Sequence, residues 1–199
     1  MIYLTSDFHF NHDKEFIYKS RGFNTIEEMN IAIISNFNNI ISSEDDVYIL
    51  GDLCLGKDLE KNKKLISSLN GNLHIIRGNH DTDNRIKMYK KCSNVVEIEN
   101  ALYFKYNNYH FFFSHFPCLS GNLSKESLKQ LVLNLYGHTH QTTKLFNDSV
   151  PYMYHVGVDA HNCKPILLDD IIEEMKIQYE KVKNHYITLK EFKLEDYDL

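Results

Sequence analysis

The sequence lacks the features that would assign it to a membrane or secreted class. No apolar run approaches the roughly 20 residues that a membrane-spanning helix requires. The first residues carry neither the basic segment nor the long apolar stretch of a signal peptide. We therefore expect a soluble protein of the cytoplasm.

Cysteine is scarce and widely spaced. The four cysteines, at positions 54, 92, 118 and 163, form no CxxC pair. A disulfide framework or a structural zinc site is therefore not expected, and a reducing compartment fits.

The chain also lacks an excess of basic residues, with a formal net charge of −5. This charge gives no strong signal for nucleic-acid binding, although bound divalent cations would change the local balance. The length of 199 residues and the hydrophobic content of 43% predict a single domain over residues 1–199 with a substantial core.

The hydrophobic pattern predicts strand–helix units first and closely spaced strands later. Early strands are expected over residues 2–6, 46–50 and 73–76, and early helices from the capping box at 25–28 and over 57–69 and 83–90. Later strands are expected over 95–98, 102–106, 109–114, 131–136, 143–146, 152–156 and 186–192, with a hairpin turn at 107–108, a helix over 170–183 and a frayed end at 195–199. This order indicates two packed sheets with helices outside.

Five short polar motifs each follow an expected strand. They are Asp7-Phe8-His9, Gly51-Asp52, Gly78-Asn79-His80-Asp81, Ser114-His115 and Gly137-His138-Thr139-His140. Strand ends are where α/β folds place their sites. A lone histidine is usually structural, but five such motifs in this order are hard to obtain by accident.

The residue types in these motifs suit divalent metals. Carboxylate, amide oxygen and imidazole favour Mn, Fe, Zn or Ni over metals that prefer thiolate. The spacing of two in Asp7/His9 and in His138/His140 places both side chains on one face of an extended strand, as a chelating pair.

Together the motifs resemble the calcineurin-like metallophosphoesterase superfamily, with its D-x-H, G-D, G-N-H-D/E, H and G-H-x-H signatures. Every signature is intact within residues 1 to about 160, and residues 6–12 also resemble a compact bacterial and phage branch of the family. The resemblance implies a four-layer α/β/β/α sandwich of two mixed β-sheets flanked by helices, which agrees with the strand pattern.

The resemblance also implies two divalent metal ions, with Mn preferred and Fe, Ni, Zn or Mg as alternatives. One ion would be held by Asp7, His9, Asp52 and His140. The other would be held by Asp52, Asn79, His115 and His138. Asp52 would bridge the two.

The implied activity is hydrolysis of a phosphodiester, small or nucleotide-like, by in-line attack of a metal-bridging hydroxide. His80 would act on the substrate as a catalytic residue and not as a ligand, with Asp81 fixing the orientation and tautomer of its ring. His12, Arg77 and His161 are candidate substrate-binding residues, and the segment 117–130 is a candidate wall of the pocket. For Arg77, an ion pair with a nearby acid is the alternative.

Three alternatives to a small-molecule phosphodiesterase remain open. The same motifs serve phosphomonoesterases, including phosphoprotein phosphatases. A nuclease is a further possibility, against which the acidic net charge counts. A non-catalytic scaffold with this fold is the third, but such proteins usually lose ligands or the histidine of the GNH signature, and here all are present.

Overall fold

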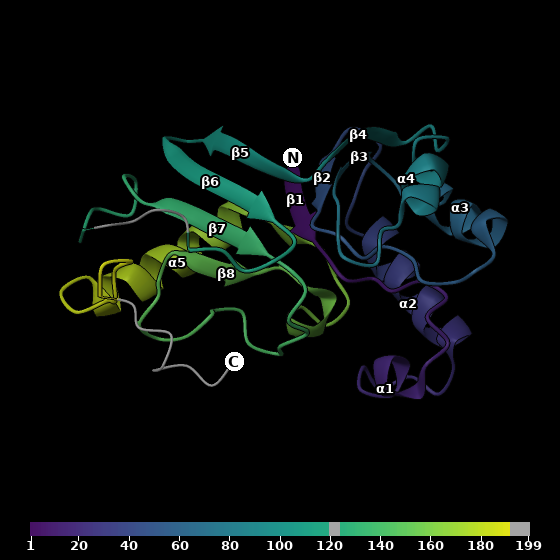
Figure 1. The fold of residues 1–199 in the computed structure, drawn as a ribbon, viewed down its shortest axis with the longest axis horizontal. Helices are drawn as coiled ribbons and strands as arrows, with labels where there is room; N and C mark the ends of the chain where they lie inside the picture. The colour runs from purple at the N-terminus through teal and green to yellow at the C-terminus, as the bar shows by residue number, and fades with distance from the viewer. Residues whose placement is uncertain (120–123, 192–199) are drawn as a thin grey trace.

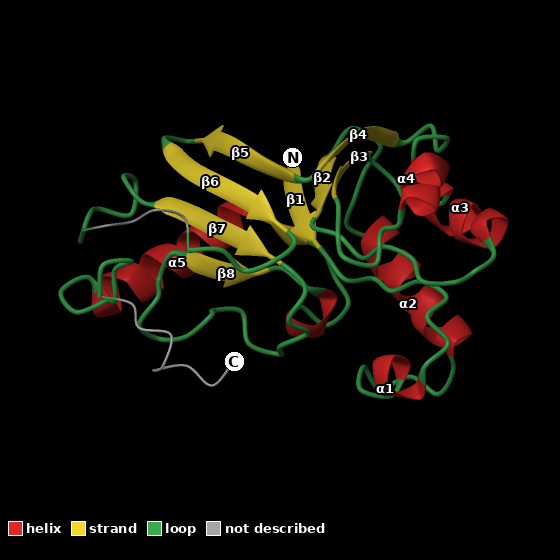
Figure 2. Cartoon of the chain, in the orientation of Figure 1, coloured by secondary structure: helices red, strands yellow, loops and turns green. Residues whose placement is uncertain are grey.

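The chain is built around two β-sheets that pack face to face (Figures 1 and 2). The computed structural model describes residues 1–119 and 124–191. The first sheet has the order β4-β3-β2-β1-β9, with strands β1 (Ile2–Thr5), β2 (Asp46–Ile49), β3 (Asn72–Ile76), β4 (Val95–Glu99) and β9 (Ile166–Leu167). Its first four strands run parallel and β9 is antiparallel to β1.

The second sheet is also mixed. It has the order β5-β6-β7-β8, with strands β5 (Ala101–Tyr106), β6 (Tyr109–Ser114), β7 (Val132–Tyr136) and β8 (Met153–His155). Strands β5 and β6 are antiparallel, whereas β6, β7 and β8 run parallel. The β5–β6 hairpin turns at Asn107 and Asn108, whose φ angles of 48° and 65° suit a tight hairpin turn.

Helices flank both sheets. They are α1 (Glu15–Tyr18), α2 (Ile26–Asn38), α3 (Leu59–Ser67), α4 (Asp83–Tyr89) and α5 (Leu168–Val182), with a 3-10 turn η1 (Val158–Ala160). The expected cap of α2 is present, since Thr25 Oγ1 accepts a hydrogen bond from the amide of Glu28 at 3.1 Å. Among the described residues, no helix is long and apolar enough to cross a membrane.

Two apolar cores hold these layers together. One lies between the outer face of the first sheet and helices α2 to α4, and includes Val47, Met29 and Phe37. The other lies between the two sheets and α5, and includes Leu4, Phe113 and Ile171. The predicted α/β fold of two mixed sheets flanked by helices is therefore confirmed.

Two predicted strands are wrong. In the segment 143–146 only Leu145 forms a bridge, to Tyr154, because the chain turns repeatedly there. Residues 186–191 form no strand, and position 192 lies outside the described residues, as does the segment 195–199. The short α1 and β9 were not predicted, because four and two residues are too few to show a hydrophobic period.

Candidate metal centre

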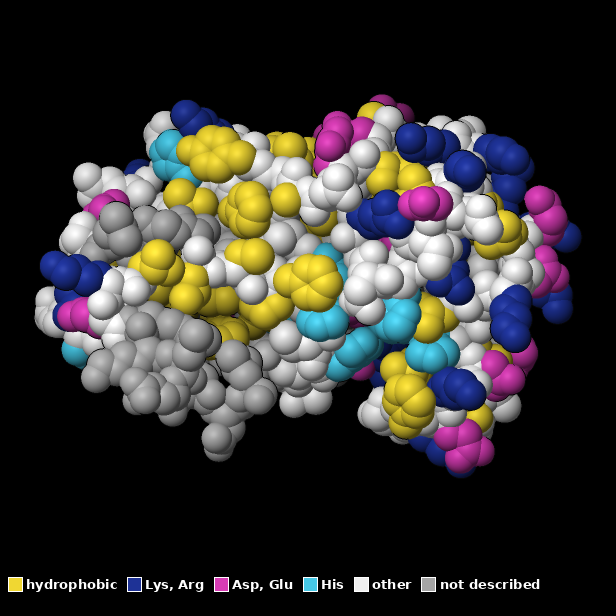
Figure 3. Space-filling model, viewed as in Figure 1, with side chains coloured by type: hydrophobic (Ala, Val, Ile, Leu, Met, Phe, Trp, Pro, Cys, Tyr) yellow, Lys and Arg dark blue, Asp and Glu magenta, His cyan; other side chains and the backbone are white. Residues whose placement is uncertain are grey.

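All five motifs meet where the carboxyl ends of parallel strands from both sheets converge. Backbone hydrogen bonds join the loops, with the amide of Asp7 donating to Gly51 O at 3.0 Å and the amide of Gly137 donating to His115 O at 3.0 Å. Figure 3 shows histidine side chains gathered on one face of the molecule, beside a hollow in its outline. The strand ends thus position one site, as the sequence predicts.

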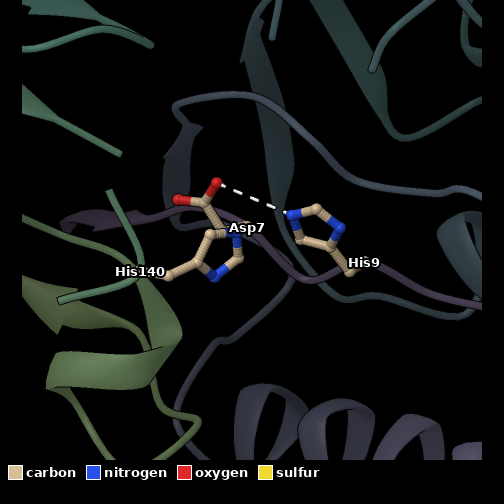
Figure 4. Close-up of side chains that lie close together, drawn as sticks. All are labelled: Asp7, His9 and His140. Carbon is tan, nitrogen blue, oxygen red and sulfur yellow. Dashed lines mark ion pairs between the residues drawn. The ribbon is translucent and has the colours of Figure 1, made fainter. Parts of the chain in front are cut away.

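The first group of candidate ligands comprises Asp7, His9 and His140. One donor atom from each lies within 4.8 Å of the others. In Figure 4 the side chains of Asp7 and His9, which follow β1, and of His140, which follows β7, lie close together, and the dashed line joins Asp7 to His9 at 3.8 Å. Asp7 and His9 are buried, at 0% and 1% exposure, whereas the His140 side chain is 34% exposed, so the group is open to solvent on the His140 side.

The second group is built around Asp52. Its Oδ2 atom lies 3.5 Å from His115 Nε2 and 3.7 Å from His9 Nε2. Asp7, Asp52 and His115 again offer donor atoms within 4.8 Å of one another. Asp52 therefore stands between the two groups, which is the position that a bridging ligand requires.

Asn79 and His138 complete the second group. The Oδ1 atom of Asn79 lies 2.8 Å from His115 Nε2 and 2.9 Å from His138 Nδ1. The structure therefore brings together all seven residues predicted as ligands.

One orphaned atom shows that this cluster fits a cation. His9 Nε2 is buried and has no hydrogen-bond partner among the described residues, yet it lies within 3.8 Å of Asp7 Oδ1 and 3.7 Å of Asp52 Oδ2. A buried polar atom without a partner needs an explanation. Imidazole and carboxylate are ligands that borderline divalent metals accept, so a bound cation would satisfy this atom.

The pKa shifts of the candidate ligands also fit a bound cation. Burial lowers the pKa of His9 to about 4, so its ring is neutral near pH 7, the form that donates a lone pair to a metal. Burial raises the pKa of Asp52, and the nearby carboxylates of Asp7 and Asp81 add to this effect. A cation would offset this crowding of negative charge.

The backbone is strained at these positions. Five of the candidate ligands have φ in the left-handed region, namely Asp7 at 59°, His9 at 53°, Asp52 at 56°, His138 at 70° and His140 at 50°. Such conformations cost about 1–3 kcal/mol each and cluster at functional sites. The packing is also tight, since a Cβ at Gly51 would lie 2.5 Å from His115 Nδ1.

A buried ion pair supports His140 from behind. His140 Nδ1 lies 2.9 Å from Asp159 Oδ2, and Arg21 donates to both oxygens of Asp159 at 2.8 and 2.9 Å. Burial opposes protonation, but the hydrogen bond to Asp159 raises the pKa of His140. Burial would also raise the pKa of Asp159, but the hydrogen bonds from His140 and Arg21 lower it to about 2. Asp159 thus holds the His140 ring with Nδ1 occupied and Nε2 free for a metal.

We expect Asp159→Asn to weaken metal binding at the group formed by Asp7, His9 and His140 by about 10–100-fold, because a carboxylate behind a ligating histidine fixes its tautomer. Calorimetric titration of metal-free protein with Mn²⁺ would measure this change. Asp83→Asn is a suitable control, since Asp83 is 80% exposed and pairs with Arg77. Wild-type affinity in a folded Asp159→Asn protein would contradict the assignment.

Asp81 does not contact the His80 ring as predicted. Its Oδ2 accepts hydrogen bonds from the amides of Asp52 and Gly78, at 2.8 and 2.9 Å, and its Oδ1 accepts from Tyr89 Oη at 2.8 Å. The prediction that Asp81 orients His80 is therefore wrong, because the loop turns the carboxylate inward, to 1% exposure. Asp81 instead ties together the two loops that carry Asp52 and Asn79.

His80 and His12 lie at the open side of the cluster. The His80 side chain is 44% exposed and its Nε2 atom lies 4.0 Å from Asp52 Oδ2. His12 Nδ1 lies 3.2 Å from His9 Nδ1, and the His12 ring centroid is 6.4 Å from that of His80. Both can therefore reach a substrate, and their roles stay predictions.

The other two candidate substrate-binding residues are held by protein partners, although Arg77 also lines a cavity together with Asn79 and His115. Arg77 donates to Asp81 O and pairs with Asp83 Oδ1, each at 2.8 Å, which is the alternative that the sequence left open. His161 is 9% exposed, and its Nε2 atom lies 2.9 Å from His155 O. The structure does not bring His161 to the candidate ligands, because the turn η1 carries its ring behind His155.

Sequence reasoning missed Arg21 and Asp159. His161 is a candidate from the sequence, whereas Asp159, two residues before it, is not. A buried pair 138 positions apart leaves no local pattern that a sequence reading could find.

Comparisons with known proteins agree with this site. A sequence profile of the Calcineurin-like phosphoesterase superfamily domain matches residues 1–154, which include all five motifs. An uncharacterized protein of Methanocaldococcus jannaschii is 35% identical over 179 residues, covering 86% of this chain and 89% of the relative. The gene 66 protein of Mycobacterium phage L5 is 25% identical over 179 residues, covering 79% of this chain and 86% of that protein. A protein of unknown function from Aquifex aeolicus shares the fold, with a TM-score of 0.64 and 22% identity over 87% of this chain and 98% of that chain.

Proposed function

Because this chain belongs to the calcineurin-like phosphoesterase superfamily and is a metal-dependent phosphoesterase, we propose that it hydrolyses phosphodiesters, small or nucleotide-like, in the cytoplasm. The observation that carries the proposal is the buried, unpartnered His9 Nε2 facing two carboxylates, next to a half-exposed His80.

The proposed site would hold two divalent cations, with Mn preferred, in the two ligand groups that share Asp52. When bound, such cations offset the charge of the phosphate and lower the pKa of a coordinated water. The protein contributes the fixed geometry, since Asp81 binds the amides of Asp52 and Gly78, and Asp159 holds the His140 ring.

His80 is the residue that we propose as the general acid. It offers a ring nitrogen at the exposed side of the cluster, where the leaving oxygen of an ester would lie. Its backbone is fixed on both sides, because its amide donates to Asp52 Oδ1 at 2.8 Å and its carbonyl accepts a hydrogen bond from Arg85. The point from which the His80 side chain extends is therefore fixed relative to Asp52.

Two cavities favour a diester over a monoester. A cavity of about 500 Å³ adjoins His140, and another of about 370 Å³ adjoins Asn79 and His115. They share no lining residue. A monoester has one organic group to place, whereas a diester has two.

We expect wild-type protein with Mn²⁺ to cleave bis(p-nitrophenyl) phosphate with a higher kcat/KM than p-nitrophenyl phosphate, because only the diester has a second organic group to bind beside the ligands. Parallel assays with Ni²⁺, Mg²⁺ and Zn²⁺ would identify the preferred metal. A faster reaction with the monoester would support the phosphomonoesterase alternative. Tight binding of Mn²⁺ without hydrolysis of either ester would support the scaffold alternative.

A further inference from the structure

Two phenylalanine side chains are exposed beside the candidate ligands, one on each side. Phe16 is 68% exposed and Phe116 is 48% exposed. Both are large apolar side chains left open to solvent in contact with histidines of the site, His12 for Phe16 and His138 for Phe116. By contrast, Phe111 and Phe113 of the second core are fully buried.

Phe16 belongs to the side of the site nearest His140. Its ring contacts His12 edge-on, at 5.8 Å between centroids, and it lines the cavity of about 500 Å³ together with His140. Ile17 and Tyr18, the next residues of α1, are buried at 6% and 9% exposure. They anchor the short helix so that the Phe16 ring is held outward.

Phe116 belongs to the opposite side. Its ring contacts His115 at 5.0 Å and His138 at 4.6 Å, both candidate ligands, and it lines the cavity of about 370 Å³ with Asn79. Its carbonyl accepts a hydrogen bond from Ser114 Oγ at 2.7 Å, which fixes the turn after β6.

This arrangement matches the shape of a diester with a ring on each side. A phosphate bound by the ligand groups around Asp52 would lie between the two phenylalanines, since Phe16 contacts His12 on one side of the site and Phe116 contacts His138 on the other. Flat rings stack on exposed aromatic side chains whatever their exact pattern of donors and acceptors. Each cavity combines an exposed phenylalanine with polar and charged side chains, such as Arg21 and Asp159 in one and Arg77 and Asn100 in the other.

We propose that Phe16 and Phe116 are the two aromatic subsites of this enzyme, each stacking a planar group on one side of the phosphodiester. The substrate class is then a diester with two base-sized rings, such as a dinucleoside monophosphate. This inference rests on the proposed function, since it assigns the organic groups of the same substrate.

The absence of tryptophan from the chain allows a direct test of each subsite. The sequence contains no tryptophan, so Phe16→Trp and Phe116→Trp each create one fluorescent reporter that can still stack. Ile31→Trp is the matched control, because Ile31 is 69% exposed on α2 and lines neither cavity. The probe is a dinucleoside methylenephosphonate, which carries two bases and cannot be cleaved, and dimethyl phosphate is the probe without rings.

We expect the dinucleoside probe, with Mn²⁺ present, to quench the emission of both site reporters and to leave the Ile31→Trp control unchanged. Dimethyl phosphate should quench none of the three. Quenching by dimethyl phosphate, or an equal response in the control, would overturn the assignment.

Kinetics separate stacking from a general structural role. Phe16→Ala and Phe116→Ala should each raise KM for bis(p-nitrophenyl) phosphate about tenfold with little change in kcat, since stacking on one aromatic ring contributes to binding on this scale. Inhibition by inorganic phosphate, which has no ring, should stay at the wild-type level. Unchanged KM in both variants, or an altered oligomeric state in place of altered KM, would overturn the proposal.

Diester hydrolysis and the aromatic subsites can be tested separately. If wild-type protein cleaves no diester but both reporters respond to the dinucleoside probe, the proposed function is wrong and the aromatic subsites stand as binding sites. If wild-type protein cleaves diesters but neither reporter responds, the aromatic subsites are wrong and the proposed function stands.

Discussion

Asp52→Asn is expected to abolish the tight binding of two metal ions and, with it, nearly all phosphodiesterase activity. Asp52 Oδ2 lies within 3.7 Å of both His9 Nε2 and His115 Nε2, so both ligand groups lose a charged donor at once. Metal ions contribute several kcal/mol to reactions of this kind. A loss on the order of 10³-fold or more in kcat/KM would follow.

The same substitution is expected to stabilise the metal-free protein. Burial raises the pKa of Asp52, with a further contribution from Asp7 and Asp81. A carboxyl whose pKa is raised on folding is destabilising when it is ionised, that is, at pH values above its usual pKa. Asparagine removes this charge. The Tm of the metal-free protein should therefore rise, by about 2–4 °C for each kcal/mol gained in a chain of this size.

Thermal unfolding with and without Mn²⁺ tests both parts of this prediction. Wild-type protein should show a large rise in Tm on adding Mn²⁺, whereas Asp52→Asn should start higher and rise little. Asp169→Asn is the control, since Asp169 is exposed at the start of α5, where it accepts a hydrogen bond from Tyr106. An Asp52→Asn protein that binds two Mn²⁺ with wild-type affinity would exclude the shared position of this carboxylate.

The sequence predicts the candidate ligands well because each of them belongs to a short motif of neighbouring residues. Each motif sits directly after a strand whose apolar pattern is clear, and parallel strands in one sheet end at a common edge. Once the strands over 2–6 and 46–50 are recognised, Asp7 and Asp52 must lie near each other. The structure meets this expectation, with Asp7 and Asp52 offering donor atoms within 4.8 Å, together with His115.

The sequence does not predict the direction that a side chain takes in the loop after a strand. Asp81 and His80 are neighbours, but one carboxylate points inward to the Asp52 amide while the imidazole stays half-exposed. Asp159 and Arg21 meet only because η1 and the loop after α1 cross behind the site. These are properties of tertiary packing, with no period or spacing that would reveal them beforehand.

The position of Phe16 is a further case. It lies on α1, a helix of four residues that leaves no hydrophobic period. In the sequence Phe16 is an apolar residue beside another, Ile17, and burial would be the natural expectation for both. The structure buries Ile17 and exposes Phe16, so the stacking surface became visible only with the fold.

His80→Ala is expected to lower kcat by about 10²–10⁴-fold while leaving the binding of two Mn²⁺ unchanged. The His80 side chain is 44% exposed. Its Nε2 atom lies 4.0 Å from Asp52 Oδ2, farther than the Nε2 atoms of His9 and His115, at 3.7 and 3.5 Å. Its removal therefore takes away a group that acts on the substrate and leaves both ligand groups intact. The loop itself should persist, because its hydrogen bonds to Asp52 and Arg85 are made by the backbone of residue 80.

Diesters with leaving groups of different basicity distinguish two possible roles of His80. A general acid matters most when the leaving oxygen is basic, so the loss in His80→Ala should be much larger for an alkyl p-nitrobenzyl diester than for bis(p-nitrophenyl) phosphate. Equal losses for both substrates would mean that His80 stabilises charge on the non-bridging oxygens instead. His110→Ala serves as the control, since His110 contacts Tyr103 on the second sheet. A folded His80→Ala protein that binds two Mn²⁺ and cleaves both diesters at the wild-type rate would remove His80 from the mechanism.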